Sequence, residues 1–536
     1  MTPPEQTAAV PWRRRRPLPA SRAGRRDPMS WLWRPTGCIP RRRAAFAAIA
    51  LLSAPVLLSC RAPLPILAVG AGELPDRVVL NLGEPPCRAM NVTWRTATTV
   101  ETGLAQLAVA TAAPDLDAAA RRVEATSQDL ELAQSDWNDA VPQSRVRYHS
   151  ARLTALEPAT PYAYRVGSED GPWSEWHQFR TPPCTDDARP ATTDAPGAAE
   201  AREDAAFRFL YFGDLQNGIL SHGARVVRTA YAAAPDAAFA LYAGDLVNDG
   251  HYDGDWAEWF AAGGWVHASL PVVPVVGNHE VRALDRARQG DPLLSIHWRA
   301  QFALPEVAEL PRSLHETVYS FDVGAARFFV LNTSFGQDEQ APWITRELQR
   351  AVDEGVRWKI VSFHFPTFSN APQRDNPELR AFVRPLFARA GVDLVLQGHD
   401  HSYGRGRDVG GEPAAETGAQ EAGEQTGPVY VISVAGAKQY ELEPSSWIDL
   451  PEDGPPPRID RMAENSQLYQ VVEVDGLRLS YRAYTADGEL YDGFELLAAE
   501  RPGGAVSKSL RELPATLPET RSFETTAIYR DDHWSR

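Results

Sequence analysis

The stretch LVLQGHDHSYGR, residues 394–405, runs from an apolar segment into Gly398 and then into His399 and His401, which are one residue apart. The apolar half predicts a buried strand, and Gly398 predicts a tight turn at its end. A single H-x-H in a polar loop is weak evidence of function, because such loops are common. What the two histidines do therefore depends on the segments that precede them.

From residue 207 onward, apolar strand-like runs alternate with helical stretches, which predicts an α/β domain over 207–497. Ligand sites in such sheets gather at the carboxyl ends of the strands. Each of the five expected strands stops at a polar group. These strand ends are Gly213-Asp214-Leu215-Gln216, Gly244-Asp245-Leu246-Val247-Asn248, Gly277-Asn278-His279-Glu280, His364-Phe365-Pro366 and Gly398-His399-Asp400-His401.

The side chains at these strand ends are carboxylates, an amide and imidazoles. Hard metal ions prefer oxygen ligands and imidazole nitrogens, and two ions held close together need a carboxylate that can bridge them. At four of the five strand ends a glycine lets the backbone turn sharply, so that the side chain after it can point into the site. Five such strand ends in one order predict a two-metal centre.

The order of these motifs resembles the calcineurin-like metallophosphoesterase superfamily, and more closely its purple acid phosphatase branch, in which a fibronectin type III-like domain precedes the catalytic domain. The resemblance covers about residues 75–497. It implies a two-sheet α/β sandwich preceded by an all-β sandwich, and hydrolysis of phosphate esters by an acid phosphatase-like enzyme. A phosphodiesterase of the same fold, or a non-catalytic envelope scaffold with a fibronectin-like binding domain, remains an alternative.

The resemblance also assigns roles to residues. Asp214 and His401 are expected to bind one metal ion, and Asp245 is expected to bridge both ions. Asn278, His364 and His399 are expected to complete the second site. His279 matches the family histidine that contacts the substrate phosphate and helps to protonate the leaving group.

The sequence departs from the family pattern at three places. Purple members carry a tyrosine three residues after the bridging aspartate, where its phenolate binds ferric iron and gives the colour, but this chain has Asn248. Many non-purple relatives have a histidine two residues after the first aspartate, and here that residue is Gln216. Either amide could donate an oxygen, so the identity of the metals stays open among Fe, Mn, Zn, Mg and Ca. Arg374 stands where plant enzymes carry one of a pair of histidines, and is either a phosphate ligand or a surface arginine.

Residues 75–183 contain short β-branched and aromatic runs separated by turns, which predicts a β-sandwich. LEPATPYAYRV resembles the tyrosine corner of fibronectin type III-like domains, with Tyr162 as the corner residue and Trp94 as the core aromatic. Cys87 and Cys184 flank this domain, and a disulfide between them is plausible in an exported protein. Residues 184–206 and 408–427 have the composition of a linker and of a loop, and 498–536 form a tail with little to bury.

The first 60 residues have the pattern of an export signal. Arg41 to Arg43 precede an apolar run that is short for a membrane span, and Leu57-Leu58-Ser59-Cys60 resembles a bacterial lipobox. A lipid anchor at Cys60 and a simple secretory cleavage are both compatible with it, as are starts at Met1 and at Met29. The protein is expected in the periplasm or cell envelope.

Charge separates the leader from the rest of the chain. Residues 1–43 carry +9, from eleven Arg against Glu5 and Asp27, so the total of −16 leaves −25 on the remainder. Nucleic-acid binding depends on Lys and Arg that neutralise phosphates, and this acidic body offers no such surface. The expected partner is the small phosphate ester that the family resemblance implies.

Overall fold

The computed structural model describes residues 70–132, 145–184, 206–281, 294–408, 427–448, 456–500 and 506–520. The export signal with Cys60, most of the linker, most of the 408–427 loop and the last residues of the tail lie outside the described residues. Among the described residues, no helix is both long and apolar enough to cross a membrane.

The N-terminal domain is a sandwich of two antiparallel sheets, as the sequence predicts. Trp94 is fully buried in its core, and the backbone N–H of Glu157 donates a 2.8 Å hydrogen bond to the hydroxyl of Tyr162, which confirms the tyrosine corner. One sheet has the order β1 (Asp76–Leu82), β2 (Met90–Thr96), β6 (Arg145–Leu153), β5 (Thr126–Glu131). The other has the order β4 (Arg121–Glu124), β3 (Leu104–Val109), β7 (Pro161–Gly167), β8 (His177–Arg180), with the short helix α1 (Leu116–Ala119) before β4.

The catalytic domain contains two seven-stranded mixed sheets. In the first, β9, β10 and β11 are parallel and the other strands antiparallel. Its order is β11 (Val272–Pro274), β10 (Ala240–Tyr242), β9 (Phe207–Phe212), β19 (Leu468–Asp475), β20 (Arg478–Thr485), β21 (Leu490–Glu500), β22 (Val506–Glu512). The second has the order β12 (Tyr319–Val323), β13 (Ala326–Val330), β14 (Trp358–Ser362), β15 (Leu394–Gln397), β17 (Val429–Ile432), β16 (Tyr403–Arg407), β18 (Arg458–Ala463).

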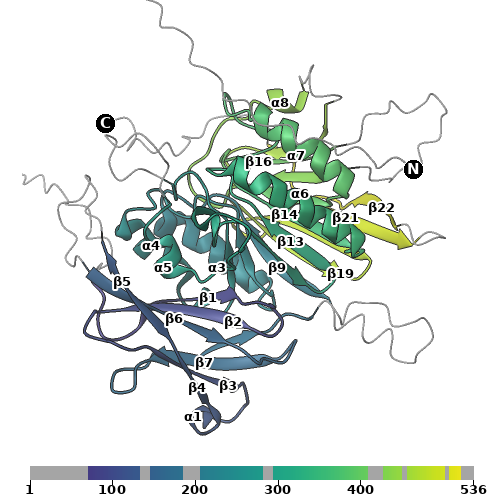
Figure 1. The fold of residues 1–536 in the computed structure, drawn as a ribbon. Helices are drawn as coiled ribbons and strands as arrows, with labels where there is room; N and C mark the ends of the chain where they lie inside the picture. Colours follow the sequence, from purple (N-terminus) through teal and green to yellow (C-terminus); the bar gives the residue numbers. More distant parts are fainter. Residues whose placement is uncertain are drawn as a thin grey trace, which may run out of the picture. The chain divides into compact units, whose positions relative to one another are not determined.

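Helices cover the outer faces of the two sheets (Figure 1). In the second sheet, alternate residues face opposite ways: Phe328 and Ile360 join the core between the sheets, whereas Phe329 and Val361 pack under α6 and α7. The helical elements are η2 (Ile219–Gly223), α3 (Ala224–Ala233), α4 (Asp253–Gly263), η3 (Gly264–Val266), α5 (Trp298–Gln301), η4 (Arg312–Leu314), α6 (Gln337–Asp353), α7 (Pro377–Ala390) and α8 (Ser445–Ile448). The fold class predicted from the sequence, a two-sheet α/β sandwich after a β-sandwich, is confirmed.

The end of the catalytic domain lies later than the sequence predicts. Strand β21 runs to Glu500 and β22 pairs with it as far as Glu512, so the boundary at 497 cuts through a hairpin. Leu510 is buried and Lys508 forms a 2.5 Å ion pair with Asp393 of the second sheet's β14–β15 region. Part of the expected tail is therefore an edge strand. Its sequence is mostly polar, so its hydrophobicity did not indicate a strand.

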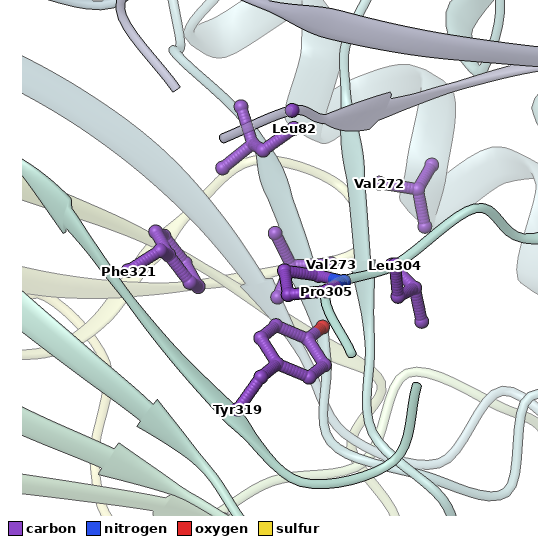
Figure 2. Close-up of a pocket in the computed structure, with 8 residues that line it drawn as sticks. Leu82, Val272, Val273, Leu304, Pro305, Tyr319 and Phe321 are labelled. Atoms are coloured by element: carbon purple, nitrogen blue, oxygen red, sulfur yellow. The ribbon is translucent and has the colours of Figure 1, made fainter. Parts of the chain in front are cut away.

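The sandwich and the catalytic domain share a buried boundary. The hydroxyl of Tyr164 donates to the carbonyl of Ala268 at 2.6 Å, and the side chain of Asn81 donates to the carbonyl of Val272 at 2.8 Å. Figure 2 shows a small apolar cavity at this boundary, where Leu82 of the sandwich meets residues of β11 and β12. Its volume is about 10 Å³, the space of one water molecule, so it is a packing gap and not a substrate pocket.

Cys87 and Cys184 form the disulfide that the sequence suggested, with their Cα atoms 5.1 Å apart. The bond closes a loop of 97 residues around the sandwich, and both cysteines are buried. Disulfides persist in oxidising compartments, which agrees with an exported protein.

We predict that the double variant Cys87→Ala/Cys184→Ala loses about 4 kcal/mol of unfolding free energy, because the bond no longer restricts a long loop in the unfolded chain. Urea unfolding of both proteins measures the difference. Dithiothreitol should lower the midpoint of the wild type and leave that of the variant unchanged. A loss below about 1 kcal/mol would contradict the prediction.

Candidate metal centre

The five strand ends singled out in the sequence come together at one edge of the two packed sheets. Asp214 follows β9 and pairs as an isolated parallel bridge with Val434, which follows β17, so the two sheets touch at this point. The structure brings all six predicted ligands into one cluster, in which four are buried and Asn278 and His399 are half-buried, and each follows the strand expected to carry it. They are Asp214 after β9, Asp245 after β10, Asn278 after β11, His364 after β14, and His399 and His401 after β15.

The backbone at this edge takes a conformation that non-glycine residues rarely adopt. Asp245, His399 and His401 all have positive φ angles, of 50°, 77° and 50°. Each such residue costs on the order of 1–3 kcal/mol and persists only where the surroundings impose it. Gly277 and Gly398 make room for this, since a Cβ atom there would lie 2.2 Å from Oδ1 of Asp245 and 2.4 Å from Oδ1 of Asp214.

The first group of donors consists of Asp245, Asn278, His364 and His399. The Nε2 atom of His364 lies 3.2 Å from three atoms: Oδ2 of Asp245, Oδ1 of Asn278 and Nδ1 of His399. One donor atom each from Asp245, His364 and His399 can be chosen so that all lie within 4.8 Å of one another. That is the spacing of ligands around a single ion.

The second group consists of Asp214, Asp245 and His401, again with donor atoms within 4.8 Å of one another. Oδ2 of Asp214 lies 3.4 Å from Nε2 of His401 and accepts no hydrogen bond although it is buried. Gln216 joins this group, because its Nε2 lies 2.8 Å from Oδ2 of Asp245 and 3.0 Å from Nε2 of His401. Asp245 is common to both groups.

Backbone carbonyls determine which ring nitrogen carries the hydrogen in two of the histidines. Nδ1 of His364 lies 2.9 Å from the carbonyl of Ala243, and Nδ1 of His401 lies 3.1 Å from that of Lys438. A carbonyl only accepts, so both Nδ1 atoms carry the hydrogen and both Nε2 atoms face the cluster. Burial lowers the pKa of His401 well below its usual value, which keeps it neutral and able to bind metal.

Two further groups of the cluster have raised pKa values. Burial opposes protonation of His364, but Asp245 and Asp214 outweigh it and raise its pKa to about 9. Burial, reinforced by Asp245, raises the pKa of Asp214 to about 7. Lone pairs therefore converge on a buried space where positive charge is strongly favoured. The residues present thus fit metal ions, by the chemistry of their donors and by the unsatisfied oxygens of Asp214 and Gln216.

Glu280 has a role that the sequence did not reveal. Its buried carboxylate accepts hydrogen bonds from the backbone N–H groups of Asp245, Leu246 and Gly277, at 2.8–3.0 Å. It therefore holds the turn after β10 against the turn after β11. The G-N-H-E motif contains this residue, but nothing in its spacing shows that its partners are backbone groups of another strand.

The other predicted site residues lie around the cluster. Nε2 of His279 is 3.7 Å from Oδ2 of Asp245, and its Nδ1 donates to the carbonyl of Asn248. Nη2 of Arg374 lies 2.6 Å from Nε2 of His399 and 2.9 Å from its carbonyl oxygen. The side chain of Asn248 instead accepts a hydrogen bond from that of Asn217 at 3.0 Å. Of the two amides that the sequence left open, Gln216 is the one that contacts ligands of the cluster.

Models of two known domains match the chain in the order found in the structure. The N-terminal domain of purple acid phosphatases matches residues 75–181, and the calcineurin-like phosphoesterase domain matches residues 207–403. The two together cover more than half of the chain. The chain belongs to the purple acid phosphatase-like branch of the calcineurin-like phosphoesterases.

Relatives of this phosphoesterase chain occur in bacteria and plants. An uncharacterized protein of Mycobacterium tuberculosis is 26% identical over 308 residues, which cover 52% of this chain and 55% of that protein. Purple acid phosphatase 15 of Arabidopsis thaliana is 23% identical, with coverage of 55% and 54%. Fe(3+)-Zn(2+) purple acid phosphatase 12 of the same plant is 27% identical, with coverage of 49% and 52%. The chain thus spans about half the length of these relatives.

Two solved structures share the fold. A purple acid phosphatase from yellow lupin seeds has a TM-score of 0.62 at 17% identity. The aligned region covers 79% of this chain and 74% of the lupin chain. PhoD has a TM-score of 0.52 at 12% identity, with coverage of 83% and 93%. At these identities the likeness concerns the fold of the phosphoesterase and not its substrate.

We predict that the iron-loaded protein shows no visible phenolate-to-iron band, because Asn248 replaces the tyrosine of the purple members. Visible absorption of protein reconstituted with ferric iron measures it. The variant Asn248→Tyr, loaded in the same way, should gain the band. A band of equal strength in the wild type would contradict the prediction.

Proposed function

We propose that the protein is an exported metal-dependent phosphoesterase that hydrolyses phosphate esters at a dinuclear centre. The observation that carries the proposal is the sharing of Asp245 between two groups of donors, each spaced for one ion. One buried carboxylate common to two such groups is the arrangement that a two-metal site requires. The chain keeps six of the seven ligands usual in the family, together with His279, which argues against a non-catalytic scaffold.

In this proposal Asp214 and His401 hold one ion, Asn278, His364 and His399 hold the other, and Asp245 holds both. The ions, when bound, acidify a water molecule and neutralise charge on the phosphoryl oxygens. Two metals are proposed, of Fe, Mn, Zn, Mg or Ca; the iron and zinc named for one relative fit this set of nitrogen and oxygen donors.

Gln216 is proposed as a further donor to the ion at Asp214 and His401. Its Oε1 is buried and has no hydrogen-bond partner, while its Nε2 lies against Oδ2 of Asp245. A half-turn of the amide exchanges the two atoms without moving the rest of the side chain, and it directs the oxygen at the cluster. A neutral amide is a weaker donor than a phenolate, which favours a divalent ion at this position.

His279 is proposed as the general acid. The bond from its Nδ1 to the carbonyl of Asn248 fixes the ring, so that Nε2 faces the centre. The doubly protonated ring then delivers its Nε2 proton to the leaving oxygen and becomes neutral, with its hydrogen on Nδ1. Its rate contribution is expected to be about 10²–10⁴-fold.

Arg374 is proposed to bind the substrate phosphate. Its hydrogen bond to Nε2 of His399 requires the lone pair of that nitrogen, so the single proton of a neutral ring must then lie on Nδ1. Ligation through Nδ1, which faces His364, moves the proton to Nε2 and breaks the bond to Arg374. The guanidinium then keeps its contacts with the carbonyl of His399 and with Asp400, and its freed N–H group can bind phosphate.

The proposed substrate is a small phosphate ester, and the proposed location is the periplasm or cell envelope. The disulfide supports export, and Cys60 remains the proposed lipid attachment site. The −25 charge of residues 44–536 gives no electrostatic attraction for a polyanion, so substrate capture is assigned to the metals and Arg374.

We predict that chelated protein is inactive and regains hydrolysis of p-nitrophenyl phosphate or bis(p-nitrophenyl) phosphate when a divalent metal is restored.

We also predict that Asp245→Asn loses at least about 10³-fold in kcat, since both ions lose their shared ligand. Asp338→Asn, at an exposed position on α6, is the matched control and should keep full activity. Steady-state rates with each metal in turn measure this. Near-full activity of Asp245→Asn, or silence of the wild type with every metal, would refute the proposal.

A further inference from the structure

A buried ion pair joins the sandwich to the catalytic domain at a place that the proposed chemistry does not use. Nη1 and Nη2 of Arg77, on β1, lie 2.7 and 2.8 Å from the two carboxylate oxygens of Asp253, the first residue of α4. The side chains are 3% and 1% exposed. The guanidinium also donates to the carbonyl of Asp253 at 3.2 Å and lies 5.6 Å from the ring centre of Phe260 on the same helix.

A second arginine of the sandwich also lies close to the carboxylate of Asp253. Nη1 of Arg95, on β2, lies 3.5 Å from Oδ2 of Asp253, while its other end pairs with Asp76 at 2.7 Å. Arg77 itself has a positive φ of 50°, a strained conformation for an arginine. Buried ion pairs seldom add stability over apolar residues of the same size, because both charges lose their hydration. A positional role explains this arrangement better than stability does.

Asp253 ends the loop that begins at Asp245, and that loop contacts His279 twice. The carbonyl of Asn248 accepts the hydrogen bond from Nδ1 of His279, and the backbone N–H of Gly250 donates to the carbonyl of His279 at 2.9 Å. Below the loop, the indole of Trp256 on α4 donates to the carbonyl of Gly250 at 2.8 Å. Hydrogen bonds and the short backbone segments between them thus link the start of α4 to the imidazole.

We infer that Arg77 of the sandwich is a positioning residue for His279, and that the sandwich thereby completes the catalytic site. The inference rests on the proposed function of His279 as the general acid. Arg77 fixes the start of α4, α4 fixes Gly250, and the loop presents the carbonyl of Asn248 that orients the imidazole. The sandwich is then part of the enzyme's active machinery and not only a separate binding module.

The leaving group of the substrate distinguishes this role from simple structural support. An acidic phenol such as p-nitrophenol leaves without protonation, whereas an alcohol such as glycerol needs a proton from the general acid. Misplacement of His279 should therefore slow the hydrolysis of glycerol phosphate far more than that of p-nitrophenyl phosphate. A general loss of folded or metal-loaded protein slows both equally.

The test measures kcat for both esters in the full chain, together with metal content. Arg77→Met should lower the ratio of kcat for glycerol phosphate to kcat for p-nitrophenyl phosphate by about tenfold or more. His279→Ala should lower the same ratio further. Metal content should stay at the wild-type value. Arg77→Lys, which keeps one charged contact, should restore part of the ratio.

Two matched control variants distinguish an effect on the loop from a general effect of disturbing the interface between the domains. Tyr164→Phe removes the hydrogen bond to Ala268, an interface contact that does not touch the loop. Arg122→Met makes the same substitution in an exposed pair with Glu169 of the sandwich. Both should keep the wild-type ratio. If Arg77→Met does not fold, Arg77→Met/Asp253→Leu removes both charges together and should show the same lowered ratio.

An unchanged ratio in a folded Arg77→Met protein, or in the double variant, would overturn the inference. So would an equal fall in Tyr164→Phe, or a loss of metal that accounts for the fall. A wild type that hydrolyses neither ester with any metal would instead overturn the proposed function on which the inference rests. The two failures are therefore distinguishable.

Discussion

The buried carboxylate of Asp245 is the constraint on which the rest of the site depends. Its Oδ2 has Nε2 of His364 at 3.2 Å and the amide of Gln216 at 2.8 Å, and its Oδ1 accepts the backbone N–H of His279 at 2.9 Å. A carboxylate removed from water in this way needs strong compensation. The strained backbone and the closely packed glycines around it hold it in place. The binding of two cations is the compensation that we propose.

The strand ends could be predicted from the sequence because each is a local pattern. An apolar run that stops at a glycine and then a polar residue predicts both the strand and the direction of the next side chain. Convergence follows from parallel pairing within each of the two sheets, among β9 to β11 in the first and β13 to β15 in the second. The bridge between Asp214 and Val434 then joins the two sheets at this edge. The fold class and six candidate ligands therefore followed from the pattern, together with the resemblance to a known family.

The features that sequence analysis missed depend on contacts between distant segments. Strands β4 and β5 are mostly exposed and polar, and β22 pairs only at the edge of its sheet, so none shows a hydrophobic pattern. Glu280 acts through backbone N–H groups, which the sequence does not distinguish. The ion pair of Arg77 with Asp253 joins residues 176 positions apart, and neither residue belongs to a motif.

The two domains are linked by more than a flexible segment. Hydrogen bonds from Asn81 and Tyr164 join the sandwich to the start of β11 and the segment before it, and those from Arg77 join it to the start of α4. Apolar side chains of both domains also belong to one continuous core. The sandwich thus contacts the start of α4, where the loop that begins at Asp245 ends.

The central claim is that one carboxylate is shared by two metal ions, and anomalous X-ray diffraction tests it most directly. Crystals of the metal-loaded protein, measured at the absorption edge of the metal, should show two anomalous peaks about 3.5–4 Å apart, with Asp245 within bonding distance of both. A single peak, or two peaks of which Asp245 binds only one, would contradict the account.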